Sequence, residues 1–199
     1  MPQDPTPKTV EFYFDFGSPA AYLAWRRIGS VAERTGATVK PIPMLLGGLF
    51  KATGNVAPAT VPAKGVYLFN DLQRFARKFG VPFLLNSAFP INTISLMRGA
   101  AGYDGSADFR TYCDTVYDAI WRDDRNMGDP AVVAEVLTAA GLDPERFTAL
   151  INDPAVKEKL KANTEEAAAR GAFGAPTFFV DGEMFFGQDR LDFVEEALA

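Results

Sequence analysis

The sequence predicts an α/β fold in which both ends of the chain contribute to one mixed β-sheet and an all-α segment is inserted between them. Residues 10–43 have a strand-helix-strand pattern, and residues 177–199 have a hairpin-helix pattern. The residues between them show helical periodicity without repeats or a low-complexity linker. The two ends can form one sheet only if the helical segment is inserted between them. We therefore expect a sheet-containing unit over 9–45 and 172–199 and an inserted helical unit over 46–171.

The first strand and the first helix meet at Ser18. The aromatic run Val10–Phe16 is typical of a buried strand, and Ser18-Pro19 is a preferred helix start. We expect this helix to end near Gly36. Its first turn would place the Ser18 hydroxyl beside unpaired backbone N–H groups at the positive end of the helix dipole, which suits an anion such as a thiolate. The alternative is that Ser18 only caps the helix.

The next segments read as a strand and a long loop. Ala37–Pro43 alternates apolar and polar residues as a second strand would. Because a helix connects the two strands, we expect them to be parallel. Residues 44–63 contain Gly47, Gly48, Gly54 and two prolines, which predicts a loop long enough to be functional.

Helical patterns fill the middle of the chain. One helix should end at Gly80, the next should begin at Asn92 and reach about Tyr103, and a long one should run from Ser106 to Trp121. Cys113 falls on the apolar stripe of the long helix, which favours a packed, unreactive thiol. Trp121 could be a core anchor or a cavity wall. The apolar stripe of the first of these helices is Val66, Phe69, Leu72, Phe75, Ala76 and Phe79, and Asp-Pro pairs at 129–130, 143–144 and 153–154 should start three more helices.

The chain ends in a predicted hairpin and helix. Thr177–Val180 and Glu183–Phe186 flank an Asp181-Gly182 turn, a common hairpin signal. Gln188 and Asp189 then precede an amphipathic segment and are expected to cap the last helix.

The composition excludes several classes of function. The 199 residues carry a net charge of −5, so a nucleic-acid partner would be repelled. There is no histidine and only one cysteine, which argues against a Ser-His or Cys-His nucleophile pair, a zinc site and an intramolecular disulfide. A reducing, cytoplasmic location fits this composition.

The N-terminal segment and the hydropathy pattern indicate no membrane association. Met1–Thr9 is polar and proline-rich, without the basic start and apolar middle of a signal peptide, and is expected to be a short disordered lead-in. No apolar run is long enough to cross a bilayer.

Four ordered motifs carry a family resemblance. The connectivity, with Gly174-Ala-Pro-Thr177 before the hairpin, resembles the thioredoxin fold, although the positions of a redox Cys-x-x-Cys read Ser18-Pro-Ala-Ala21. Without a thiol there, disulfide exchange is excluded. The four motifs together resemble the 2-hydroxychromene-2-carboxylate isomerases, DsbA-like relatives of the kappa-class glutathione transferases. They are Phe14–Ala24, Lys51–Asn55, Asp71–Arg74, and Gly174–Thr177 followed by Phe186–Leu191.

The resemblance implies a glutathione site. In the family, glutathione thiolate adds to the substrate, the chromene ring opens, a bond rotates and elimination returns the thiol. Ser18 would stabilise the glutathione sulfur, and Ala175, before a cis Pro176, would pair with the cysteinyl backbone. The γ-glutamyl end would be held by Phe186, Gly187, Gln188 and Asp189, although Asp189 could equally be a simple cap.

The resemblance also implies the substrate and its contacts. Family members interconvert 2-hydroxychromene-2-carboxylate and trans-o-hydroxybenzylidenepyruvate in the breakdown of naphthalene-type aromatics, and a homodimer is expected. The substrate, a small aromatic carboxylate, would be bound by Lys51, Asn55, Phe89, Asn92 and Trp121. By its sequence alone Lys51 reads as a solvated loop residue.

Two departures from the family pattern bear on the substrate. Thr60-Val61 stands where some members carry Asn-Arg, and Phe89 stands where they carry a tyrosine. Two other functions stay open: conjugation of glutathione to an electrophile, as in kappa-class transferases, and a non-catalytic protein that binds glutathione or small acids.

Overall fold

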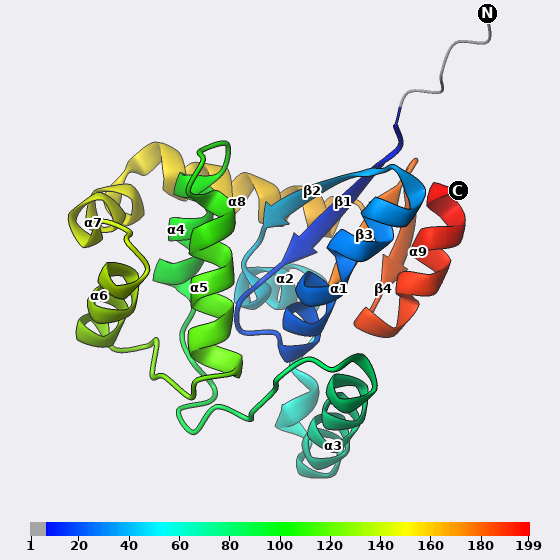
Figure 1. The fold of residues 1–199 in the computed structure, drawn as a ribbon, viewed down its shortest axis with the longest axis horizontal. Helices are drawn as coiled ribbons and strands as arrows, with labels where there is room; N and C mark the ends of the chain where they lie inside the picture. The colour runs from blue at the N-terminus through cyan, green and yellow to red at the C-terminus, as the bar shows by residue number, and fades with distance from the viewer. Residues whose placement is uncertain (1–6) are drawn as a thin grey trace, which may run out of the picture.

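Both ends of the chain contribute strands to one four-stranded mixed sheet. In the computed structural model, which describes residues 7–199, the strand order is β2-β1-β3-β4 (Figure 1). β1 (Thr9–Phe14) pairs parallel with β2 (Thr38–Pro43) and antiparallel with β3 (Thr177–Val180), and β4 (Glu183–Phe186) forms the edge next to β3. The predicted mixed sheet built from the two ends is confirmed.

The helical insertion predicted between β2 and β3 is also confirmed. In Figure 1, α4 to α7 lie together on one side of the sheet, and α3 lies apart below it. Helix α1 (Pro19–Thr35) joins the two parallel strands, and the short turn η2 (Gln188–Arg190) and α9 (Leu191–Leu198) follow the hairpin. The insertion consists of α2 (Leu46–Thr53), the short turn η1 (Pro58–Thr60), α3 (Pro62–Phe79), α4 (Ile94–Tyr103), α5 (Phe109–Trp121), α6 (Pro130–Ala139), α7 (Pro144–Asn152) and α8 (Pro154–Ala169).

The two faces of the sheet are covered by different helices because successive strand residues point to opposite sides. Phe12 and Phe14 of β1 belong to the large core formed with α1, α5 and α9. Tyr13, between them, belongs to a smaller cluster with Leu49 of α2 and Ala167 of α8. Burial on both faces explains why β1 reads as a continuous apolar run.

Local turn signals were placed correctly. Ser18 caps α1 by accepting a hydrogen bond from the Ala21 amide, and Gly36 ends the helix at φ 69°. Asp181 and Gly182 both have positive φ, at 49° and 87°, as a tight primed hairpin turn requires. The three predicted Asp-Pro starts are confirmed, since Asp129, Asp143 and Asp153 each cap a helix.

The prediction that residues 44–63 form a loop is wrong in part, because α2 lies inside it. Glycines weaken an isolated helix, but this one is held by tertiary contacts. The Leu46 amide donates to Asp15, the Leu45 amide donates to Thr164 on α8, and Leu49 is fully buried. A Cβ at Gly48 would lie 3.2 Å from the Thr164 methyl, so glycine allows the close approach of α2 and α8.

Several boundaries or faces also differ from the predictions, among them the start of α4, which is Ile94 rather than Asn92. β1 spans Thr9–Phe14 rather than Val10–Phe16, and α5 begins at Phe109 rather than Ser106. Val66 is 65% exposed, because α3 buries only a narrow stripe. Gln188 and Asp189 form the turn η2 and make no side-chain capping bond to α9.

The predicted disordered lead-in falls mostly on residues 1–6, outside the described range, whereas Thr9 belongs to β1. Within residues 7–199, none of the helices combines the length and apolar character needed to cross a bilayer.

Candidate functional site

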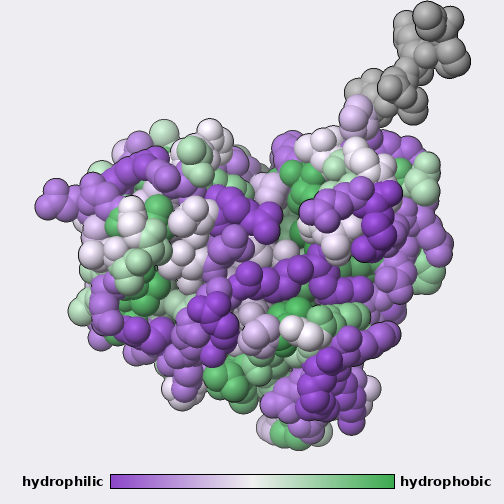
Figure 2. Space-filling view, in the orientation of Figure 1, coloured by the Kyte–Doolittle hydropathy of each residue, from purple (hydrophilic) through white to green (hydrophobic). Residues whose placement is uncertain are grey.

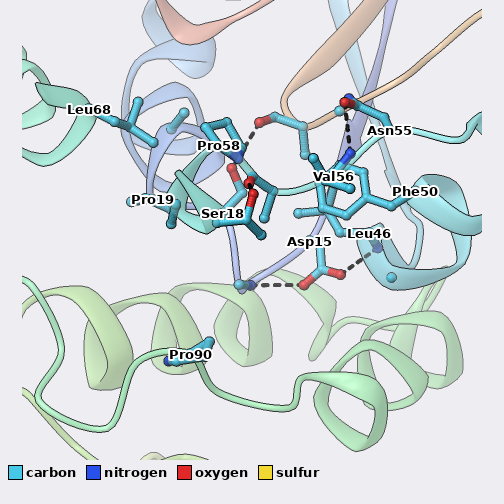
Figure 3. A pocket seen from close by; sticks show the side chains of 18 of the residues that line it. Asp15, Ser18, Pro19, Leu46, Phe50, Asn55, Val56, Pro58, Leu68 and Pro90 are labelled. Atoms are coloured by element: carbon cyan, nitrogen blue, oxygen red, sulfur yellow. Dashed lines mark hydrogen bonds between the residues drawn. The ribbon is translucent and has the colours of Figure 1, made fainter. Parts of the chain in front are cut away.

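A cavity of about 780 Å³ opens at the N-terminal end of α1. Its walls come from the loop before α1, the first turn of α2, residues 55–61 between α2 and α3, one face of α3, the segment before α4, the loop before β3 and the end of β4 (Figure 3). On the face seen in Figure 2, hydrophobic residues show between α3 and the rest of the molecule. The sequence predicts that Ser18, Asn55, Phe89, Asn92, Ala175 and Phe186 belong to one site, and all six line this cavity.

Ser18 lies at the centre of the polar part of the cavity. Its hydroxyl accepts a hydrogen bond from the Ala21 amide (3.1 Å) and donates one to the Ala175 carbonyl (2.9 Å), and only 6% of the residue is exposed. The hydroxyl has a single proton, so it can stabilise an anion in the cavity only by turning away from Ala175.

Two backbone amides beside Ser18 have no acceptor among residues 7–199. The Ala20 amide belongs to the first turn of α1, and the Ala175 amide lies just before Pro176; both residues line the cavity. The Ala175-Pro176 bond is cis, as the thioredoxin resemblance implied. The cavity therefore offers a hydroxyl and two N–H donors close to the positive end of the α1 dipole, a set suited to an anion and to an extended peptide.

Asp15 connects three walls of the cavity, as Figure 3 shows for two of its bonds. Its carboxyl accepts hydrogen bonds from the Gly17 amide (2.8 Å), the Leu46 amide (2.8 Å) and the Thr93 hydroxyl (2.7 Å). These donors belong to the loop before α1, to α2 and to the residue before α4. Asp15 was not among the site residues predicted from the sequence, although it is the single charged residue between Phe12 and Trp25.

Burial raises the pKa of the Asp15 carboxyl above its ordinary value of 3.8, and the three hydrogen bonds oppose this only in part. The folded protein then holds this proton more tightly than the unfolded chain. Between pH 3.8 and the raised pKa, Asp15 makes stability fall as pH rises, by at most about 1.4 kcal/mol per pH unit.

We expect the unfolding free energy of the wild type, minus that of Asp15→Asn, to decrease from pH 4 toward neutrality. The asparagine side chain does not titrate, so its steric cost is the same at each pH. Urea unfolding of both proteins across this range measures the difference. A difference that grew with pH would show that the hydrogen bonds outweigh burial.

Lys64 is the cation of the cavity. Of the residues that line it, only Asp15 and Lys64 are charged, and Lys64 forms no ion pair within residues 7–199. The sequence does contain a signal for it, since Lys64, Leu68 and Leu72 are spaced by four residues on one face of α3 and all line the cavity.

Aromatic rings form one wall. Phe89 meets Phe69 of α3 edge to face at 5.5 Å between centroids. Trp121, predicted to contact the substrate, does not line the cavity. It is fully buried behind Phe89, 5.8 Å between centroids, and its indole N–H donates to the Phe16 carbonyl (2.8 Å). Of the two roles considered for it, the structure shows the core anchor.

Lys51 also lies outside this cavity. Phe50, one residue earlier on α2, lines it, whereas Lys51 lines a neighbouring cavity. Consecutive helix residues differ in direction by about 100°, so one position decides which cavity a side chain enters.

Asn55 and Asn92 line the cavity, but some of their polar atoms already form hydrogen bonds within the protein. The Asn55 amide donates to the Phe173 carbonyl (2.8 Å) and its oxygen accepts from the Val56 amide (2.8 Å), which joins the segment after α2 to the loop before β3. The Asn92 oxygen accepts from the Ile94 amide (3.1 Å) at the start of α4.

Of the residues predicted to hold a γ-glutamyl group, one lines the cavity and three do not. Phe186 lines it and packs on Phe173 at 4.5 Å between centroids, but Gly187, Gln188, Asp189 and Pro176 do not line it. Asp189 pairs with Arg190. The Gln188 side-chain oxygen is buried and has no hydrogen-bond partner within residues 7–199, but it does not reach the cavity.

Other reactive groups are few in the described part of the chain. Cys113 is fully buried, and burial raises the pKa of its thiol well above the ordinary value, so it is an unreactive core residue. Residues 7–199 contain no cluster of three or more histidine, cysteine or acidic side chains that could hold a metal ion.

Comparisons with known proteins agree with the geometry. A family model described as a DSBA-like thioredoxin domain matches residues 9–199. The 2-hydroxychromene-2-carboxylate isomerase of Sphingobium xenophagum is 35% identical, covering 96% of this chain and 98% of that protein. Human glutathione S-transferase kappa 1 is 27% identical, covering 98% and 92%. A solved 2-hydroxychromene-2-carboxylate isomerase superposes with a TM-score of 0.86 at 31% identity, covering 96% of this chain and 94% of that one.

Proposed function

Because the chain belongs to the 2-hydroxychromene-2-carboxylate isomerase family of DsbA-like thioredoxin-fold proteins, we propose that it is a glutathione-dependent cis-trans isomerase. Its substrate pair would be 2-hydroxychromene-2-carboxylate and trans-o-hydroxybenzylidenepyruvate. The observation that carries the proposal is the donor set around Ser18, placed where the redox members of the fold keep a cysteine.

The residues present fit glutathione. The unpaired Ala175 amide, which lines the cavity, suits the backbone of a bound peptide. When bound, glutathione would supply a thiolate that adds reversibly to the substrate, so that a double bond can rotate as a single bond. The Ser18 hydroxyl and the Ala20 amide would stabilise the charge on sulfur.

The rest of the cavity suits a flat, apolar acid. Phe69, Phe89 and Leu72 form apolar walls on which an aromatic ring can pack, and Lys64 supplies the positive charge for a carboxylate. No histidine exists to move protons, and an addition that depends on a stabilised thiolate does not need one.

A thiol-balance assay tests the proposal. With 2-hydroxychromene-2-carboxylate, enzyme and a small amount of reduced glutathione, we expect many product molecules per glutathione and no loss of free thiol. Loss of one thiol per product would instead identify a kappa-type transferase. A rate independent of glutathione would contradict both enzymatic functions.

We expect Lys64→Gln to raise KM for the aromatic carboxylate about tenfold with a smaller change in kcat, because an ionic hydrogen bond to a carboxylate contributes about 1.5–3 kcal/mol. Arg77→Gln is the matched control, since it removes a positive charge from α3 without lining the cavity. Equal KM values for the two variants would contradict the role of Lys64.

A further inference from the structure

A second cavity, of about 710 Å³, lies between α2, α4 and α8. It adjoins the first, since Leu45 and Ile94 line both. Ser18 and the loop before β3 do not line it, so the donor set described above does not serve it.

Its walls carry an excess of positive charge. The cations are Lys51 from α2, Arg98 from α4, and Lys157 and Lys161 from α8. The two acidic residues, Glu158 and Glu165, are both within 4 Å of Lys161.

The other three cations are unpaired. Lys51, Arg98 and Lys157 make no ion pair with any residue from 7 to 199. Arg98 and Lys157 are also partly buried. Lys51 is exposed. Like charges from three helices around one hollow repel one another, and an anion that shares the site would relieve this repulsion.

We propose that this second cavity binds a small organic dianion with an apolar body, such as an aromatic or aliphatic dicarboxylate. Three unpaired cations can balance the two negative charges of such a dianion. Leu45, Ala52, Ile94 and Leu160 supply apolar walls that favour a hydrocarbon body over a bare inorganic ion. Lys51 then belongs to this site rather than to the cavity at Ser18.

Calorimetric titration with phthalate at low salt, without glutathione, tests the inference independently of the proposed isomerase. We expect saturable binding at one site per chain, weaker for benzoate and for inorganic phosphate, and weaker again as salt is added. Arg98→Gln and Lys157→Gln should each raise Kd about tenfold, the usual loss for one charged hydrogen bond.

Two variants serve as controls. Lys159→Gln removes the same charge from α8 at a residue that does not line the cavity and pairs with Asp104, so it should leave Kd unchanged. Lys64→Gln tests the first cavity. The inference is overturned if phthalate fails to bind at millimolar concentration, if Lys159→Gln weakens binding as much as Arg98→Gln, or if only Lys64→Gln weakens it. Equal affinity for phosphate and phthalate would contradict the claim that the cavity prefers an organic dianion.

Discussion

Replacing Ser18 with alanine is expected to lower kcat/KM of the glutathione-dependent reaction by about ten- to a hundredfold, since a donor to a thiolate contributes about 1.5–3 kcal/mol. The same change should lower the free energy of unfolding by only about 1–2 kcal/mol, through loss of the α1 cap and of the bond to the Ala175 carbonyl. Steady-state kinetics and urea unfolding of one preparation measure both effects.

Asp129→Ala is the matched control for this variant. Asp129 caps α6 through the Ala131 amide, so its loss also costs about 1 kcal/mol of helix stability, but it lies outside the cavity. We expect this variant to keep full activity. If Ser18→Ala were as active as Asp129→Ala, Ser18 would be a cap and nothing more.

The parts of the fold that the sequence predicted depend on local chemistry. Ser18-Pro19, Gly36 and the Asp181-Gly182 turn each specify a backbone conformation within a few residues, and the structure has all of them. The mixed sheet follows from these elements, because strand-helix-strand connections are right-handed and a hairpin pairs its own strands.

The features that the sequence did not predict depend on contacts between distant segments. Helix α2 exists because Asp15 and Thr164 accept hydrogen bonds from its first amides, and neither partner is near it in sequence. The same holds for Trp121, whose place behind Phe89 depends on how α5 packs against the segment before α4.

The cavity includes predicted residues whose backbone a motif fixes, and it lacks one predicted residue whose position depends on a helix face. Ser18 and Ala175 flank the strand ends of the sheet, so the connectivity places them together. Lys51 and Phe50 differ by one helix position, and a motif match without the helix could not tell which of them faces the cavity. Lys64 was missed because the apolar stripe predicted for its helix included Val66, which is exposed, whereas Lys64 lies on the face with Leu68 and Leu72.

Gly99→Ala should lower the free energy of unfolding by about 2–3 kcal/mol, the cost of overpacking a core that cannot relax freely. A Cβ at Gly99 of α4 would overlap the Tyr112 hydroxyl oxygen and lie 2.7 Å from the Phe147 ring. Tyr112 is fully buried and donates to the Leu96 carbonyl (2.7 Å), so it cannot move away without losing that bond. Thermal and urea unfolding measure the loss.

Gly29→Ala is the opposite case and serves as the control. Gly29 lies inside α1, where an added Cβ meets no atom within 4 Å, so alanine should raise stability by about 0.5–1 kcal/mol. Neither glycine lines the cavity. At a temperature where both variants are folded they should match the wild type in kcat/KM. These two glycine variants therefore change stability without changing the catalytic step. Ser18→Ala should do the opposite, because it should lose activity while the protein remains folded.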